Sequence, residues 1–253
     1  MPFFTMLMLF GAGILSGICN AVAGGGTFFT FPVLMAAGLP PVVANASNTV
    51  AVWPGHALAL ISYRDQISEA KTNLTGSIVT VLAGGVLGAF LMIMAGNQGF
   101  SKLIPFLILF ATILFANGQR FYKWLNTHED STHLSPALVR LIEFVIAVYG
   151  GFFSAGLGIM FMAGLLMLGV TDIQMNNALK NLLGMLVTTI ALLIFILSGL
   201  VSWPHTIVTF AGAILGGFWG GRIARILPEL WLRWTVISVG SGLTFYYFFK
   251  YYL

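Results

Sequence analysis

The chain has 253 residues, of which 58% are hydrophobic and only 7% are charged, and its mean hydropathy is +0.97. So few polar side chains could not cover a water-soluble globule, and the composition therefore predicts an all-α polytopic membrane protein. The net charge of +4 does not indicate nucleic-acid binding, because the basic residues are scattered between apolar segments.

The first half of the chain is predicted to contain a long helix, a half-helix and three further spans. The long helix covers residues 3–22, and a break at Ala23-Gly24-Gly25-Gly26 separates it from a half-helix at 27–37. At about 1.5 Å per residue the half-helix covers roughly 16 Å, about half of a hydrocarbon core. The further spans are expected near residues 42–62, 73–95 and 103–123.

A polar segment at 126–137 is predicted to link two transmembrane repeats, which cover residues 1–125 and 138–253. His128 and His133 lie in this linker, but they do not supply the ligand number of a metal site, and we expect no metal. The second half has the same order of elements: a helix at 138–155, a break at Ala155-Gly156-Leu157-Gly158, a half-helix at 159–169, and helices near 174–198, 204–221 and 231–250.

A shift of 132 positions aligns the two breaks with each other and also aligns Asn45-Ala46 with Asn177-Ala178. A constant offset of this kind is expected of a transporter built from internal repeats. Irregular backbone at membrane depth is tolerated only where it is buried in protein or lines a cavity. Two matched breaks therefore predict one central binding site.

Charge placement predicts the orientation of the repeats. If each long helix and its half-helix form a hairpin that returns to its starting face, nine of the eleven basic residues share one face: Arg64, Lys71, Arg120, Lys123, Arg140, Lys180, Arg222, Arg225 and Arg233. The positive-inside rule makes that face cytoplasmic, so we expect inverted repeats in the inner membrane with both termini outside. The alternative is an eight-span protein with parallel halves, in which each long helix of about 20 residues crosses the bilayer.

The broken helices suggest an anion site. A helix that begins inside the membrane at Thr27 or Ile159 directs unpaired N–H groups and the positive end of its dipole toward the cavity. Glycines let an anion approach the backbone closely. The predicted ligands at the breaks are Gly24, Gly25, Gly26, Thr27, Gly156 and Gly158. The alternative is that these glycines only permit tight helix packing.

Polar side chains lie in the first turns of the helix that follows each half-helix. Their spacings of three and four place them on shared helix faces, and the predicted ligands among them are Asn45, Asn48, Thr49, Asn177, Lys180 and Asn181. Lys180 is the strongest candidate, because a cation in a membrane span is costly and usually functional. The alternative is that Lys180 extends to the cytoplasmic interface beside Asp172.

Two more residues complete the predicted site. Asn20 precedes the first break by about one turn, and Trp53 lies beside Pro54, which can kink its helix so that the indole walls a cavity. Simple packing is the alternative for Trp53.

At these residues the chain resembles the sulfite exporter TauE/SafE family of membrane permeases. The segment from Gly13 through the first break to Asn48 is similar to the first family repeat, and the segment from Gly150 to Asn181 is similar to the second. The resemblance covers nearly the whole chain. It implies a transporter of small sulfur-containing anions such as sulfite, sulfoacetate or related organosulfonates.

We therefore expect a secondary transporter that moves a small anion by alternating access. A membrane enzyme is not expected, because no paired intramembrane carboxylates, histidine cluster, nucleotide loop or Ser/His/Asp set is evident. A scaffold subunit without transport activity is the alternative, and it would leave the Asn and Gly groups without a ligand. The expected partners are a small anionic substrate and the lipid bilayer, with no nucleic acid and no cofactor; a homodimer is left open.

Overall fold

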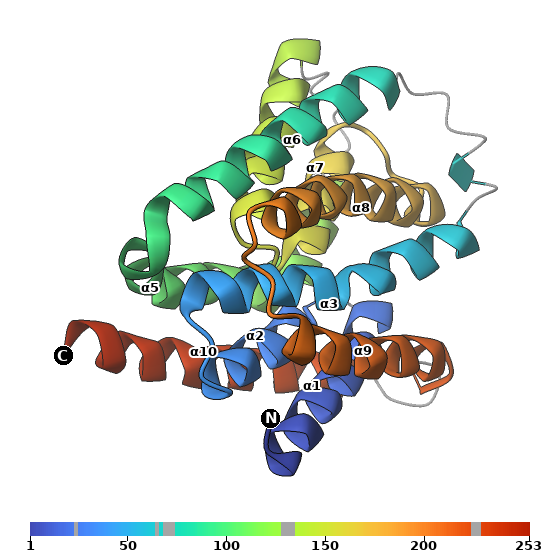
Figure 1. Ribbon diagram of the computed structural model, residues 1–253. Helices are drawn as coiled ribbons and strands as arrows, with labels where there is room; N and C mark the ends of the chain where they lie inside the picture. Colours follow the sequence, from blue (N-terminus) through green and yellow to red (C-terminus); the bar gives the residue numbers. More distant parts are fainter. Residues whose placement is uncertain (23–24, 64–65, 68–73, 128–134, 224–228) are drawn as a thin grey trace.

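A computed structural model describes residues 1–22, 25–63, 66–67, 74–127, 135–223 and 229–253. Within these ranges the chain folds into nine helices and no strand (Figure 1). This confirms the all-α fold that the composition predicts.

The first half comprises α1 (Phe3–Val22), α2 (Thr27–Ala36), α3 (Pro41–Ser62) and α5 (Leu74–Thr127). Helix α5 is interrupted at Gly96, whose φ of 60° and ψ of −177° are not helical. Only glycine adopts such a backbone conformation readily. The predicted spans at 73–95 and 103–123 therefore correspond to two segments, 74–95 and 97–127, that meet at a kink.

The second half comprises α6 (Pro136–Phe152), α7 (Leu157–Met167), α8 (Ile173–Leu197), α9 (Trp203–Ile223) and α10 (Glu229–Tyr252). The side chain of Ser135 caps α6 and that of Asp172 caps α8, each accepting a backbone N–H of the first turn. Helix α7 begins two residues earlier than predicted, because Gly156 takes a left-handed φ of 79° and the helix starts directly after it.

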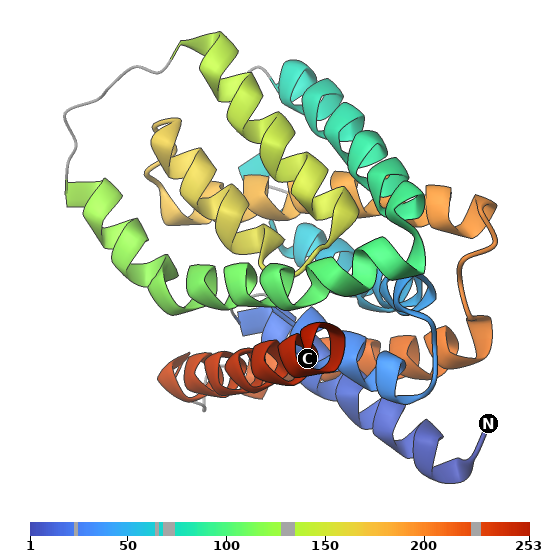
Figure 2. The same ribbon diagram turned by 90° about the vertical axis from the view of Figure 1, so that its left-hand side faces the viewer.

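The first helix of each half packs against a helix of the other half. Helix α1 packs against α9, and α6 packs against the 74–95 segment of α5 (Figures 1 and 2). These backbones approach very closely: a Cβ placed on Gly216 would lie 2.1 Å from the carbonyl oxygen of Ile14, and one on Gly88 would lie 2.1 Å from that of Val148. Small residues permit such close helix packing in membranes.

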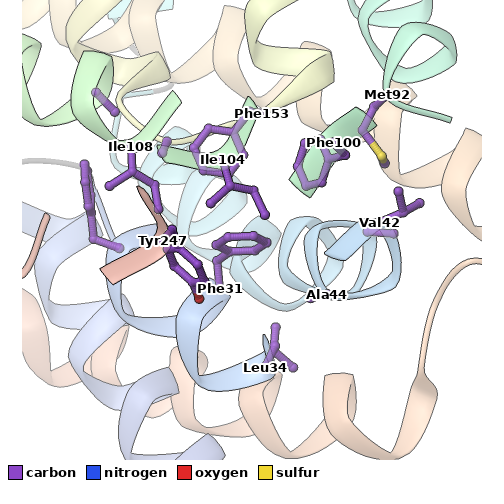
Figure 3. Packing of buried hydrophobic residues seen from close by; sticks show 14 of the residues in the cluster. Phe31, Leu34, Val42, Ala44, Met92, Phe100, Ile104, Ile108, Phe153 and Tyr247 are labelled. Atoms are coloured by element: carbon purple, nitrogen blue, oxygen red, sulfur yellow. The ribbon is translucent and has the colours of Figure 1, made fainter. Parts of the chain in front are cut away.

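Helices α3 and α8 lie side by side and run in opposite directions (Figure 1). A buried core joins the two halves beside them, with Phe31 of α2 in edge contact with Phe153, which follows α6, at 5.5 Å between ring centroids (Figure 3). The first turns of α3 pack into the same core. The outer surface carries large apolar side chains, such as Met94 and Leu197, which are 81% and 86% exposed.

Within the described part of the chain, three helical stretches are long and apolar enough to cross a membrane: Phe3–Asn20, Leu74–Asn117 and Ile173–Leu197. Helices α2 and α7 are also apolar, but they have only 10 and 11 residues. A helix needs about 20 residues to span the hydrocarbon core. The half-helices expected at 27–37 and 159–169 are therefore present as separate short elements.

Candidate functional site

The first break places the start of α2 beside the end of α1. The side-chain oxygen of Asn20 accepts a hydrogen bond from the backbone N–H of Gly26 at 2.8 Å. Gly25 has a φ of 113°, which side-chain-bearing residues rarely adopt. Asn20 thus takes up one of the N–H groups that a helix start leaves without an intrahelical acceptor.

The second break also contains a glycine with a positive φ, Gly156, but there no side chain of the described residues caps the start of the helix. The carbonyl of Gly156 accepts from the N–H of Ile159 at 3.0 Å, and the N–H of Leu157 donates to Ser154 at 3.3 Å. Among the described residues, no acceptor is present for the N–H of Gly158. The first turn of α7 therefore keeps a free backbone donor and the positive end of its dipole.

The two breaks meet. The hydroxyl oxygens of Thr27 at the start of α2 and Ser154 before α7 lie 3.5 Å apart, at the outer limit of a hydrogen bond. A cavity of about 40 Å³ opens beside them. That volume exceeds the roughly 10–15 Å³ that one water molecule requires, so the cavity has room for a small ion.

The cavity is lined by both breaks and by α3 and α8. The lining residues are Asn20, Gly25, Thr27, Val52, Gly55, Ser154, Gly156, Leu157, Gly158, Ile159, Lys180 and Asn181. None of these twelve described residues is acidic. The polar side chains among them are one amine, two amides and two hydroxyls, all of which can donate hydrogen bonds.

Lys180 is the only cation among the described lining residues. Its ammonium donates to the side-chain oxygen of Asn177 at 2.8 Å. Its stem passes over the first turn of α7, because a Cβ placed on Gly158 would lie 3.8 Å from the Lys180 Cδ. A side-chain cation and a positive helix terminus thus adjoin the same cavity, and this favours an anion there.

Seven of the fourteen predicted ligands line the cavity: Asn20, Gly25, Thr27, Gly156, Gly158, Lys180 and Asn181. Gly24 lies outside the described residues. Gly26 does not reach the cavity, because its N–H is bound by Asn20 and a Cβ placed on it would lie 2.1 Å from the hydroxyl of Ser16. At Gly26 the geometry favours the packing alternative.

The other predicted ligands hold the structure around the cavity. Asn48 bonds to the hydroxyls of Thr30 and Thr27, while Thr49 donates to the carbonyl of Asn45 at 2.9 Å. The side-chain amide of Asn45 donates to the carbonyl of Phe152 at 3.1 Å, next to the second break.

Trp53 and Asn177 do not line the cavity either. The indole N–H of Trp53 donates to the hydroxyl of Thr189 at 2.8 Å and so ties α3 to α8. Asn177 contacts the Lys180 ammonium. Lys180 and Asp172 are both described and form no ion pair; Asp172 instead accepts from the N–H of Met175 at 2.7 Å. The interfacial alternative for Lys180 therefore lacks its proposed partner.

The predicted ligand set omits five lining residues: Val52, Gly55, Ser154, Leu157 and Ile159. Ser154 and Leu157 adjoin the second glycine break, and position relative to that break is the signal that could have found them. Val52 and Gly55 are three residues apart on α3 and share a helix face, but apolar residues of this kind are common throughout the chain.

Comparison with known proteins gives consistent matches over most of the chain. The family model described as sulfite exporter TauE/SafE matches residues 9–247. A probable membrane transporter protein of Haemophilus influenzae is 26% identical over 241 residues, which cover 94% of this chain and 92% of the relative. The probable membrane transporter protein YfcA of Escherichia coli K12 is 26% identical over 239 residues, covering 92% and 86%.

The probable membrane transporter protein ORF9 of a Sinorhizobium species is 26% identical over 226 residues, which cover 88% of this chain and 85% of the relative. No solved structure matches the chain.

Proposed function

Because this chain belongs to the sulfite exporter TauE/SafE family and is a membrane transporter, we propose that it carries small sulfur-containing anions across the inner membrane. Sulfite, sulfoacetate and related organosulfonates are the proposed substrates. The proposed binding site is the cavity between the two breaks.

The position of Lys180 carries this proposal. Its ammonium and the start of α7 adjoin a cavity with no acidic residue among the described lining residues. Two positive groups without a facing carboxylate repel each other, and an anion relieves that repulsion. A hydrogen bond to a charged group contributes about 1.5–3 kcal/mol, and a helix N-terminus adds about 0.3–1 kcal/mol.

The remaining donors suit a small oxyanion that must also be released. Asn20, Asn181, Thr27 and Ser154 offer neutral amide and hydroxyl groups. A site with several cations would hold a dianion tightly, whereas one ammonium with neutral donors binds it less strongly. The apolar wall formed by Val52 and Ile159 is compatible with the carbon chain of an organosulfonate.

We also propose that the two halves are inverted repeats, which would supply alternating access. The break and half-helix recur in the same order, and α3 and α8 run in opposite directions. Segments 84–88 (Gly-Gly-Val-Leu-Gly) and 216–220 (Gly-Gly-Phe-Trp-Gly) share the 132-residue offset of the breaks. Each segment lies in the helix that packs on the first helix of the other half.

Transport assays in proteoliposomes test this proposal. Purified protein is reconstituted and its uptake of sulfite, sulfoacetate, longer organosulfonates and carboxylates is measured with and without a proton gradient. We expect saturable transport of at least one sulfur-containing anion and at least tenfold less by Lys180→Ala. Lys102→Ala is the matched control, because Lys102 is exposed and lies outside the cavity.

A protein that moves carboxylates but no sulfur-containing anion would overturn the proposed substrate class. A protein that neither binds nor moves any anion of the panel would favour the scaffold alternative.

A further inference from the structure

Equivalent segments of the two halves differ in how deeply they are buried. Asn45 and Asn177 are each the fifth residue of their helices, α3 and α8. Residues 44–50 of α3 are all buried, and Asn45 is only 1% exposed. In the corresponding residues 176–182 of α8, Asn177, Lys180, Asn181 and Leu182 are half-buried and only the other three are buried.

Two connections cover the start of α3. The side-chain oxygen of Asn97, directly after the kink in α5, accepts from the backbone N–H of Val42 at 3.1 Å. The hydroxyl of Ser47 accepts from the N–H of Ser202, in the α8–α9 connection, at 2.9 Å. The start of the second segment of α5 and the α8–α9 connection are thus both hydrogen-bonded to the first turns of α3.

An aromatic cluster lies between this covered end and the cavity. Phe31, Phe100 and Phe153 are at most 1% exposed, and their ring centroids are 5.5–6.3 Å apart (Figure 3). Phe31 is one turn beyond Thr27 in α2, and Phe153 precedes Ser154. The cluster therefore adjoins the Thr27 and Ser154 pair, and it packs in one core with the first turns of α3.

We infer that Phe31, Phe100 and Phe153, together with the covered start of α3, form a closed gate on the side of the site where α3 begins. The other side, where α8 begins, is the open one in this structure. This inference rests on the proposed function, since a transporter with inverted repeats alternates access between its two ends. In the proposed orientation the closed end is periplasmic and the structure faces the cytoplasm.

Buried side-chain oxygens without a hydrogen-bond partner among the described residues occur near the start of both helices, at Asn45 of α3 and at Asn176 of α8. A buried acceptor without a partner is unfavourable, and opening of the gate would let water reach the Asn45 oxygen.

Cysteine labelling tests the asymmetry without any substrate. Cys19 is the only cysteine, so a Cys19→Ala background carries single cysteines at chosen positions. Thr49→Cys and Asn181→Cys occupy equivalent depths in α3 and α8. With a membrane-impermeant maleimide we expect Asn181→Cys to react from the cytoplasmic side at least tenfold faster than Thr49→Cys reacts from either side.

Adding Phe100→Ala should raise labelling of Thr49→Cys from the periplasmic side. If Asn181→Cys does not fold, Asn177→Cys replaces it in the comparison. Equal labelling of the α3 and α8 positions would overturn the inferred closed gate.

A disulfide across the gate tests its role in transport. The 2.9 Å between the Ser47 hydroxyl and the Ser202 nitrogen is compatible with the Cα separation of roughly 4.4–6.8 Å found in disulfides. We expect oxidised Ser47→Cys/Ser202→Cys protein in the Cys19→Ala background to lose at least nine-tenths of sulfoacetate transport, to regain it on reduction, and to bind sulfoacetate in both forms. Sulfoacetate is the probe because sulfite itself cleaves disulfides. The two single-cysteine variants are the controls.

Full transport by completely cross-linked protein would overturn the gate. If neither form binds or moves sulfoacetate, the proposed substrate fails instead, and the labelling comparison still decides whether the gate is present.

Discussion

The hydroxyl oxygens of Thr27 and Ser154 lie 3.5 Å apart, although the two residues are separated by 127 positions in the chain. Thr27 is the first residue of α2 and Ser154 precedes α7. Both helix starts therefore converge on one point of the bundle. Because each helix start is a region of positive potential, their meeting concentrates that potential where the cavity lies.

Removing the charge of Lys180 should weaken anion binding. Lys180→Ala deletes the only cation among the described lining residues, and we expect sulfite affinity to fall by about ten- to hundredfold, since a charged hydrogen bond contributes about 1.5–3 kcal/mol. Lys180→Arg should restore binding only in part, because a guanidinium is larger and planar. Calorimetry at two salt concentrations measures both effects, and an unchanged affinity of Lys180→Ala would remove the residue from the site.

Filling the cavity at Gly158 should block binding without damaging the fold. Gly25 and Gly156 have positive φ angles, so side chains there would strain the backbone. At Gly158 a Cβ would meet nothing closer than the Lys180 Cδ at 3.8 Å. We expect Gly158→Leu to reduce transport at least tenfold with little change in thermal stability. Gly217→Leu is the control, since Gly217 lies in α9 with open space around its Cβ position and away from the cavity.

A strong loss of thermal stability in Gly158→Leu, with Gly217→Leu unaffected, would indicate that Gly158 serves packing rather than the site.

The sequence alone predicts the helices and their two breaks well, because the apolar runs are long and the breaks recur at one offset. Glycine clusters alone are not sufficient, since those at 84–88 and 216–220 lie within continuous helices. The predicted helix at 3–22 coincides with α1, and the half-helix at 27–37 with α2 to within one residue. The sequence predicts separate spans at 73–95 and 103–123, but it does not predict that the two helical segments meet directly at Gly96. A single glycine is common within a membrane helix and does not by itself indicate a kink.

The composition of the cavity wall was harder to predict. Spacings of three and four show which residues share a helix face, but they do not show which neighbour that face meets. Asn45 and Asn48 are therefore predicted as ligands, yet neither lines the cavity. Asn45 bonds to Phe152, and Asn48 bonds to Thr30 and to the lining residue Thr27. In a water-soluble protein the polar face of a helix is the one exposed to solvent. Here many exposed side chains are apolar, so polarity does not show which face of a helix is exposed.

Arg140 should contribute to stability rather than to binding. It contacts Glu143, which is 4% exposed, and Ser77 of α5 bonds to the same carboxylate at 2.8 Å. Arg140→Ala would leave a buried carboxylate without its cation, and we expect a loss of about 2 kcal/mol or more in stability. Thermal unfolding in detergent measures this. The double variant Arg140→Ala/Glu143→Gln should recover part of the loss, and its failure to do so would assign the effect to other contacts of Arg140.

Both termini should lie on the periplasmic side. This orientation places nine of the eleven basic residues on the cytoplasmic face. Reporter fusions after Leu253 should therefore be active only for periplasmic reporters, and fusions in the 126–137 linker only for cytoplasmic ones. A cytoplasmic reporter that is active after Leu253 would contradict the inverted arrangement.

Asn177 should act through Lys180 and not on the anion. Its side-chain oxygen holds the Lys180 ammonium at 2.8 Å, whereas Asn177 itself does not line the cavity. Asn177→Leu removes that contact and frees the ammonium to adopt other rotamers, so we expect sulfite affinity to fall about threefold to tenfold, corresponding to roughly 0.6–1.4 kcal/mol. In the Lys180→Ala background the same substitution should change affinity little, because the group that Asn177 positions is gone.

Calorimetry on the wild type, both single variants and the double variant completes this double-mutant cycle, and the effects of the two substitutions on sulfite affinity should be clearly non-additive. Additive losses would show that Asn177 contacts the anion directly or acts through the fold, and the positioning role would then be wrong.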